Sequence, residues 1–308
     1  MTLHFETPLM ESRALSALGD QSVWLKLDAL QPCGSFKIRG IGHACAVHQS
    51  RGAQRFVSSS GGNAGLAVAY AGRRLGMPVV VVVPETTTAR AKELLRLEGA
   101  EVVVHGSSWQ EANQFAQTLL GATDAFVHPF DDPLLWHGHA TLIDEVAHAR
   151  FKPDAVVLSV GGGGLLSGVV EGLQRNRWHD VPVLAVETEG AASFHAALAA
   201  GHPVELPCIS SVATSLGAKR VCEQALHCAR EHPVHSLVVS DYSALAACER
   251  FLADHRILVE PACGAALSVA YDRHPALAGY SKILVIVCGG ATATIDQIRT
   301  WAAQAGRA

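Results

Sequence analysis

The sequence predicts an α/β protein whose strands lie in largely parallel sheets. Short apolar runs rich in β-branched residues recur along the 308 residues, as expected of strands buried on both faces, at positions 79–83, 102–104, 155–160, 183–186 and 283–287. Alanine- and leucine-rich stretches with helical spacing lie between them, for example at residues 64–75 and 111–120. This repeated alternation is typical of the α/β class. No repeat or linker divides the chain, so we expect any second domain to be an insertion or a continuation.

Composition excludes several classes of protein. The chain is 49% hydrophobic and 17% charged, and its net charge of −4 without a basic run predicts no nucleic-acid partner. No apolar stretch approaches the ~20 residues that span a membrane, and the acidic N-terminal residues do not resemble a signal peptide. Eight cysteines without a CxxC pair predict reduced thiols in the cytoplasm. His137 and His139 lack a second cluster of metal ligands, so we interpret them as ordinary loop or cap residues.

Glycine clusters mark three junctions where a strand run gives way to a helical stretch, at residues 58–65, 161–165 and 288–290. Ligands of open α/β sheets bind beyond the carboxyl ends of the strands. The run of four glycines at 161–164 lets backbone N–H groups converge on an anion at a helix N-terminus, and we expect a phosphate there. The alternatives are a simple tight turn and a dinucleotide-binding loop, but the latter needs a glycine at the position of Ser167.

The junction at residues 58–65 offers a second anion site. The predicted strand at 55–57 runs into three serines, and Gly62 and Asn63 then open a helix. Backbone N–H groups and hydroxyls at such a helix start would receive a small carboxylate. Serine and asparagine also favour N-caps, and this second interpretation is compatible with the first because one cap can hold an anion.

Lys37 lies in the segment GSFKIRG between Phe36 and Ile38. Desolvation by such neighbours favours the neutral amine, which is the form that attacks aldehydes. Taken alone, a lysine of this kind is usually a solvated surface residue. Cys288 ends the last strong strand run, where a lone cysteine is usually a small hydrophobic residue. The significance of Lys37 therefore depends on its combination with the two anion sites.

Six segments together resemble the fold-type II pyridoxal-phosphate (PLP) enzymes of the serine/threonine dehydratase group, and they are GSFKIRG, SSSGGNAG, FDDPLLWHGHA, SVGGGGLLSG, LVEPACGAAL and VIVCGG. The resemblance runs from residue 5 to residue 300. It implies a tryptophan synthase β-like fold with two open, twisted, mostly parallel sheets and flanking helices. The implied large domain comprises residues 1–37 and 134–308, the implied small domain comprises residues 38–133, and PLP lies between them.

The implied activity is that of an L-serine/L-threonine ammonia-lyase (a serine dehydratase or threonine deaminase of amino-acid degradation). It removes water and then ammonia from L-serine or L-threonine, giving pyruvate or 2-oxobutanoate. The resemblance also implies a cytoplasmic homodimer whose partner is a small amino acid. Another PLP reaction, such as racemisation or β-replacement, and a catalytically silent PLP-binding protein remain as alternatives. The intact Lys37 argues against the silent protein.

The resemblance implies a role for each matching residue. Lys37 would carry the cofactor and later move the Cα proton, with Ser60 as a second catalytic residue. The implied cofactor-binding residues are Phe36, Lys37, Asn63, Gly161, Gly162, Gly163, Gly164, Leu165 and Cys288, the last facing the ring nitrogen. The implied substrate-binding residues are Ser59, Ser60, Gly61, Gly62, Asn63 and Ala213. A monovalent cation such as K⁺ would be held by Gly161, Glu187, Ala191, Ser193, Leu216 and Ala218.

Two residues depart from the pattern of the group. Gly61 stands where many relatives have alanine or serine, so we expect about a methyl group of extra space near the reacting carbons and no side-chain hydroxyl for the leaving group. Protonation of the leaving group would then fall to the cofactor phosphate. Ala291 replaces the serine that often follows CGG, which removes one hydrogen bond near the cofactor.

Overall fold

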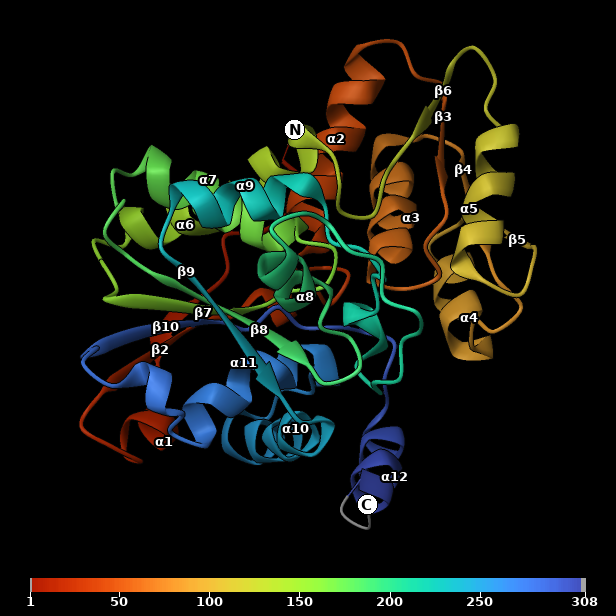
Figure 1. Ribbon diagram of the computed structural model, residues 1–308. Helices are drawn as coiled ribbons and strands as arrows, with labels where there is room; N and C mark the ends of the chain where they lie inside the picture. Colours follow the sequence, from red (N-terminus) through yellow and green to blue (C-terminus); the bar gives the residue numbers. More distant parts are fainter. Residues whose placement is uncertain (1, 306–308) are drawn as a thin grey trace.

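The computed structural model describes residues 2–305 and contains two sheets (Figure 1). The larger sheet has six strands in the order β1 (Leu9–Glu11), β2 (Ser22–Lys26), β10 (Lys282–Ile286), β7 (Ala155–Ser159), β8 (Val183–Thr188) and β9 (Val234–Val239). Only the β1–β2 pair is antiparallel in this sheet, and its other pairs are parallel.

Helices cover both faces of the six-stranded sheet (Figure 1). One face carries α6 (Pro133–His148), α7 (Gly164–Arg175) and α9 (Glu223–Glu231), and the other carries α1 (Arg13–Ser16), α10 (Asp241–His255) and α11 (Pro261–Tyr271). The remaining elements of this part are α8 (Ser193–Ala200), α12 (Ile295–Ala305) and the short 3₁₀ turns η1 (Asp28–Leu30), η2 (Thr214–Leu216) and η3 (Pro275–Leu277). We call this part the six-stranded unit.

The smaller sheet is parallel throughout, in the order β5 (Glu101–Val104), β4 (Val79–Val83), β3 (Arg55–Ser58) and β6 (Asp124–Phe126). The five valines of β4 show why it is buried on both faces. Val79, Val81 and Val83 pack in one core with α3 (Asn63–Leu75) and α4 (Ala89–Leu97), whereas Val80 and Val82 pack in another with α5 (Trp109–Thr118). We call these four strands and three helices the four-stranded unit.

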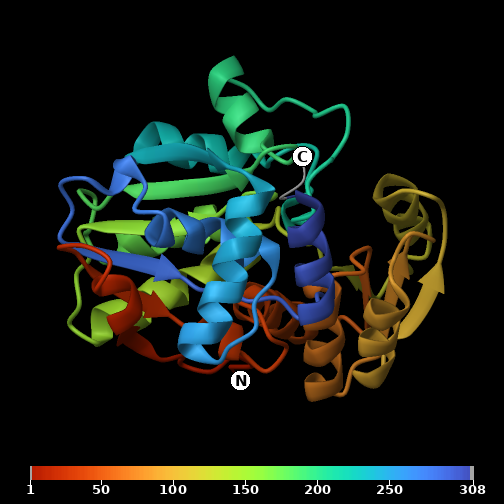
Figure 2. The same ribbon diagram turned by 90° about the horizontal axis from the view of Figure 1, so that it is seen from below.

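Helix α2 (Lys37–Ser50) lies between the two units and packs against both α6 and α3. Helix α12 lies at the side where the two units meet, as Figure 2 shows from below. The described helices include none that is both long enough and apolar enough to cross a membrane.

The apolar runs predicted as strands are confirmed, with ends that differ by one or two residues. The predicted helices at 64–75 and 111–120 correspond to α3 and α5, the latter beginning and ending two residues earlier than predicted. Strands β1, β2, β6 and β9 were not predicted, because they are short or because polar residues interrupt their apolar runs. The strands of the smaller sheet all fall within residues 38–133, but the domain boundaries themselves stay a prediction.

Candidate active site

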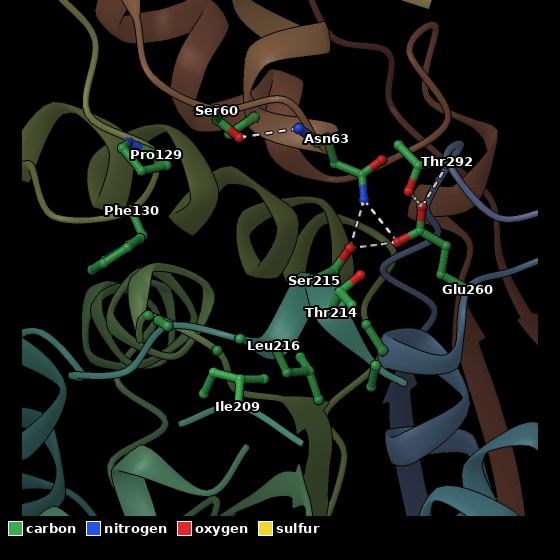
Figure 3. Close-up of a pocket in the computed structure, with 18 of the residues that line it drawn as sticks. Ser60, Asn63, Pro129, Phe130, Ile209, Thr214, Ser215, Leu216, Glu260 and Thr292 are labelled. Carbon is green, nitrogen blue, oxygen red and sulfur yellow. Dashed lines mark hydrogen bonds between the residues drawn. The ribbon is translucent and has the colours of Figure 1, made fainter. Parts of the chain in front are cut away.

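A cavity of about 820 Å³ lies between the two units. Its walls combine segments that are far apart in the sequence, namely residues 35–37, 60–64, 84 and 86–88, the glycine run 161–164 and residues 212–220, together with Glu260 and Cys288. Figure 3 shows part of this wall, with Ser60, Asn63, Ser215 and Glu260 labelled. Two of the three glycine junctions singled out in the sequence, together with the cysteine that opens the third, therefore line one cavity with Lys37.

Lys37 is the first residue of α2, and the segment before it is attached to the end of β10. The backbone N–H of Phe36 donates to the carbonyl of Cys288 at 3.0 Å, and that of Gly290 donates to the carbonyl of Gly34 at 2.8 Å. The Lys37 Nζ donates to the carbonyl of Pro129 at 2.7 Å. Burial lowers the Lys37 pKa from 10.5 to about 8, so a substantial fraction of the amine is neutral near physiological pH.

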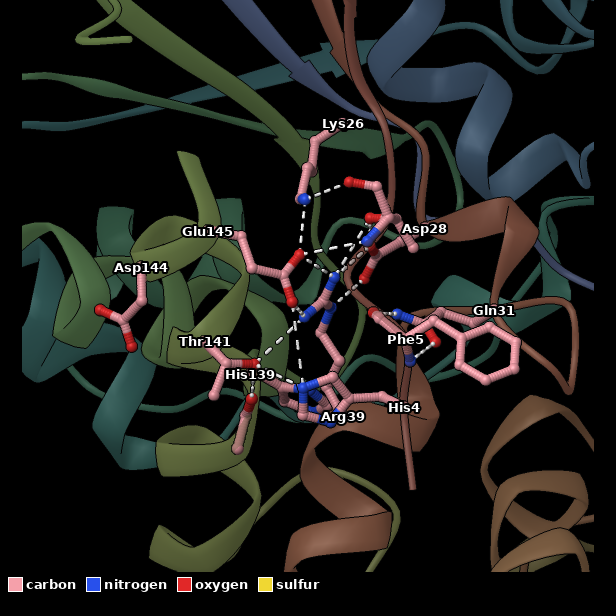
Figure 4. A network of polar contacts seen from close by, with 12 residues as sticks. His4, Phe5, Lys26, Asp28, Gln31, Arg39, His139, Thr141, Asp144 and Glu145 are labelled. Atoms are coloured by element: carbon pink, nitrogen blue, oxygen red, sulfur yellow. Dashed lines mark hydrogen bonds and ion pairs between the residues drawn. The ribbon is translucent and has the colours of Figure 1, made fainter. Parts of the chain in front are cut away.

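A buried network of charges holds the start of α2 in place (Figure 4). The Arg39 guanidinium is fully buried and lies between two carboxylates, with Nε 2.6 Å from Asp28 Oδ2 and Nη2 2.8 Å from Glu145 Oε2. Lys26 Nζ lies 2.5 Å from the same Glu145 oxygen. Because Asp28 and Glu145 belong to the six-stranded unit, these ion pairs attach α2, and with it Lys37, to that unit. The sequence around Arg39 gave no sign of this role.

The predicted phosphate site is the loop between β7 and α7. Gly163 occupies the N-cap position with φ of 94°, and α7 begins at Gly164. The first N–H groups of a helix have no partner within it, so Gly164 and Leu165 present donors to the cavity, which both line. This geometry suits the phosphate of a small cofactor.

Three glycines of the run also have a packing reason. A β-carbon on Gly162 would lie 2.2 Å from the Phe130 ring, one on Gly164 would lie 2.7 Å from the Phe130 carbonyl oxygen, and one on Gly161 would lie 3.0 Å from Leu216 Cα. Close packing alone therefore demands glycine at these positions. Phosphate binding is supported by the free helix end and not by the glycine content itself.

The asparagine loop between β3 and α3 faces the glycine run across the cavity. Ser60, Gly61, Gly62 and Asn63 line the cavity, and the Ser60 hydroxyl accepts a hydrogen bond from the Gly62 N–H at 3.3 Å. Ser59 differs from expectation, because its buried hydroxyl donates to Asn113 Oδ1 at 2.8 Å inside the four-stranded unit. Only the backbone of Ser59 remains for a role in substrate binding.

The extra space expected at Gly61 is already filled. A β-carbon built on this glycine would lie 2.8 Å from Thr87 Cγ2 and 2.9 Å from Thr87 Oγ1. The expectation of a larger pocket at this point is therefore wrong, because Thr87, which also lines the cavity, occupies that space. No signal in the sequence pointed to Thr87, since its segment lies 26 residues away.

Cys288 lies at the end of β10 on the cavity wall and is buried. A hydrogen bond with Cys263 and burial raise the pKa of the Cys288 thiol well above its usual value. The thiol therefore stays neutral, as expected of a partner that places no charge beside a ring nitrogen. Ala213 also lines the cavity, in the segment just before η2.

Three of the residues expected to bind a cation surround the end of β8. The buried Glu187 carboxylate accepts hydrogen bonds from the N–H groups of Phe194 and His195, both at 2.8 Å, while burial raises its pKa to about 7. The Ser193 hydroxyl is buried and has no hydrogen-bond partner among residues 2–305. A buried carboxylate that forms no ion pair within residues 2–305, beside an unpartnered hydroxyl, would suit a bound cation. Ala191 is buried next to this pair, whereas Gly161, Leu216 and Ala218 line the main cavity.

Three polar residues of the cavity wall had no signal in the sequence. Glu260, Ser215 and Thr292 form a hydrogen-bonded group around the Asn63 amide (Figure 3). The segment LVEPACGAAL, which contains Glu260, was part of the resemblance, but the spacing of its residues gave no reason to connect Glu260 with Asn63.

The donors of the cavity fit PLP. Lys37 offers a partly neutral amine for the aldehyde, the start of α7 offers N–H groups for the phosphate, Asn63 offers an amide for the phenolic oxygen, and Cys288 offers a neutral thiol for the ring nitrogen. Phe36 lines the same wall, with its ring centre 5.2 Å from Lys37 Nζ.

Comparison with known proteins gives matches along nearly the whole chain. The human (Homo sapiens) L-serine dehydratase/L-threonine deaminase is 50% identical over 315 residues, covering 99% of this chain and 96% of the relative. The human protein named serine dehydratase-like is 50% identical over 298 residues, covering 93% of this chain and 90% of the relative.

Solved structures agree with this likeness. A fungal L-serine ammonia-lyase from Rhizomucor miehei superposes with a TM-score of 0.92 at 38% identity, covering 97% of this chain and 99% of that one. Maize serine racemase superposes with a TM-score of 0.88 at 24% identity, covering 98% and 92%, which demonstrates a shared fold only. The model of the family described as pyridoxal-phosphate dependent enzyme matches residues 1–289. The chain therefore belongs to the family of pyridoxal-phosphate dependent enzymes.

Proposed function

We propose that this protein is an L-serine/L-threonine ammonia-lyase, which converts L-serine to pyruvate and L-threonine to 2-oxobutanoate, with release of ammonia. The observation that carries the proposal is the position of Lys37, whose amine has a pKa of about 8 and lies in one cavity with a helix N-terminus and an asparagine loop. The dehydratases and the ammonia-lyase that the chain resembles support this choice among PLP reactions.

When bound, PLP supplies a conjugated ring that takes up the electron pair left behind when a proton leaves the substrate Cα. The start of α7 would bind the phosphate through the N–H groups of Gly164 and Leu165, and Phe36 would pack beside the ring. Asn63, one of whose amide N–H groups donates to Glu260, would donate the other to the phenolic oxygen. Cys288 keeps its proton, so it adds no charge at the ring nitrogen, and the protein does not favour long storage of negative charge there.

The substrate carboxylate binds at the start of α3, where Ser60, Gly61 and Gly62 line the cavity and the helix end favours negative charge. Lys37 Nζ, in its neutral form, takes the proton from Cα as a general base. Loss of the β-hydroxyl as water and hydrolysis of the remaining product give the 2-oxo acid and ammonia. Water is lost and then regained, so the net reaction of serine yields only pyruvate and ammonia.

We extend the proposal to a monovalent cation bound by Glu187 and Ser193, with Gly161, Ala191, Leu216 and Ala218 as further ligands. The burial of the Glu187 carboxylate, which has no ion-pair partner among residues 2–305, supports it. We also propose a cytoplasmic homodimer. The eight cysteines, which are all free, support a reducing compartment, and light scattering of the purified protein would measure its mass.

The decisive test is an assay of purified protein with L-serine and with L-threonine. We expect release of the 2-oxo acid and of ammonia in equal amounts, and no release from the Lys37→Ala variant with an unchanged fold by circular dichroism. Chromatography on a chiral phase tests the alternatives, because a racemase would form D-serine from L-serine. Formation of D-serine without oxo acid, or full activity of Lys37→Ala, would contradict the proposal.

A further inference from the structure

Glu260 connects the two units at the wall of the cavity (Figure 3). It is only 3% exposed, and its carboxylate accepts four hydrogen bonds. Oε2 accepts from Asn63 Nδ2 at 2.9 Å and from the Ser215 hydroxyl at 2.6 Å, and Oε1 accepts from the N–H and the hydroxyl of Thr292 at 2.7 and 2.6 Å. Of these donors, only Asn63 belongs to the four-stranded unit.

The surrounding chain makes room for this carboxylate. Glu260 occupies the N-cap position of α11, yet its side chain does not cap the helix and turns to the cavity instead. The positive end of the helix dipole favours a carboxylate there. Gly290 adopts φ of 129°, and a β-carbon on it would lie 2.3 Å from Glu260 Cδ. The second glycine of the CGG segment is therefore needed where the Glu260 carboxyl group packs.

The Asn63 amide is held at both ends. Its Oδ1 accepts from the Ala291 N–H at 3.0 Å, which directs Nδ2 toward Glu260. The amide cannot flip without losing both bonds, because each end would then face a group of the wrong kind. Asn63 is also the first residue of α3, so these two bonds, with a longer one from Nδ2 to the Ser215 hydroxyl at 3.4 Å, attach the start of that helix to the six-stranded unit.

We propose that Glu260 is a positioning residue that acts as a latch, holding Asn63 and the start of α3 closed against the six-stranded unit. Hydrogen bonds to a charged acceptor are stronger than those between neutral groups, so separation of the two units at this point costs the Asn63–Glu260 bond. That Asn63 is thereby aimed at PLP rests on the proposed function. The latch itself does not, because it is a contact of the apoprotein.

Glu260→Gln should break the latch selectively. The Thr292 N–H can only donate, so it retains the glutamine oxygen, and the glutamine NH₂ then faces Asn63 and Ser215. The Ser215 hydroxyl can turn and accept, whereas the Asn63 NH₂ cannot. In hydrogen–deuterium exchange of the apoprotein, we expect residues 62–70 to exchange about tenfold faster or more, with β7 and β8 unchanged.

Swapping the amide and the carboxyl group between positions 63 and 260 should restore the latch. In Glu260→Gln combined with Asn63→Asp, the aspartate accepts from both the glutamine NH₂ and the Ala291 N–H, so exchange of residues 62–70 should return close to wild type. Asn63→Asp alone places two carboxylates together and should open the contact. Asn63→Ala tests the latch from the other side if Glu260→Gln does not fold. Glu249→Gln is the control, because it removes the same charge from the surface of α10, where Glu249 lies 3.5 Å from Arg299.

PLP titration of the same variants gives the second measurement. We expect about tenfold weaker binding in Glu260→Gln and unchanged binding in Glu249→Gln. Exchange at residues 62–70 that is equal in wild type and Glu260→Gln would overturn the proposal, even if activity fell. Exchange in the swapped double variant as fast as in Glu260→Gln would overturn it too. Failure of the wild type to release oxo acids would contradict the proposed function but leave the exchange result intact.

Discussion

Replacing Glu145 by glutamine should destabilise the protein by several kcal/mol, because two buried cations would then face a single carboxylate. Lys26 Nζ and Arg39 Nη1 each lie 2.5 Å from a Glu145 oxygen, and the two cationic side chains are 1% and 0% exposed. Asp28, which is also fully buried, pairs with Arg39 and cannot compensate both charges. The change keeps the size of the side chain, so the effect isolates the charge.

The expected magnitude follows from the burial. Breaking a buried ion pair by removing one partner costs about 3–5 kcal/mol. A chain of 308 residues has an unfolding entropy of about 0.65 kcal/mol/K at ~2.1 cal/mol/K per residue, so the melting temperature should fall by about 5–8 °C. Differential scanning calorimetry of the apoprotein measures this shift directly.

The neighbouring Asp144→Asn variant is a matched control. Asp144 lies on the same helix and loses the same charge, but its partner Arg175, 2.6 Å away, is 34% exposed. Surface pairs contribute about 0–1 kcal/mol, so the melting temperature should fall by less than about 2 °C. Equal shifts in the two variants would refute the conclusion that burial makes the Arg39 network important for stability.

Four further predictions concern the candidate active site and the residues around it. The rate of PLP uptake by the apoprotein should rise with pH and reach half of its maximum at about pH 8, because the desolvated Lys37 reacts as the neutral amine. A half-maximal rate near the ordinary lysine pKa of 10.5 would contradict this. The apoprotein should also gain stability above pH 8, since the unfolded chain then binds more protons than the folded one. Potassium should raise the melting temperature and the activity, and Glu187→Gln should abolish both responses; a wild type indifferent to millimolar potassium would count against the cation site. Gly61→Ala should lower kcat/KM for serine and threonine and cost about 1–3 kcal/mol of stability, because its methyl group meets Thr87, and adding Thr87→Ala should recover most of the loss.

The parts of the fold that the sequence revealed are those with continuous local signals. The valines of β4 identified a strand buried on both sides, and the glycines at 161–164 marked the start of α7. In β9, His235 and Ser236 interrupt the strand and leave an apolar run of only three residues at 237–239, although the strand pairs with β8 over six residues. Local pattern could not reveal it because its place in the sheet depends on tertiary pairing.

The candidate site likewise contains residues that have a local signal in the sequence and residues that have none. Lys37 and Asn63 stand in segments whose composition signals an anion or a reactive amine, so they could be proposed from the sequence. Thr87 and Glu260 matter only through distant contacts, with Gly61 and with Asn63, and the residues beside them give no sign of this. The phosphate interpretation of the glycine run stays a prediction, and the glycine content is weak support for it, because Phe130 already requires two of those glycines.

The attachment of α2 through Arg39 has an evolutionary consequence. Lys37 is fixed to one half of the cleft, whereas Ser60 and Thr87, which line the opposite wall, belong to the other half. Mutations on this wall that spare Ser60 and Asn63 can therefore change which amino acid fits without disturbing Lys37. A mutant library restricted to residues 84–88 should yield variants of altered substrate range that still take up PLP, so new specificities can be selected from a scaffold whose chemistry is inherited unchanged.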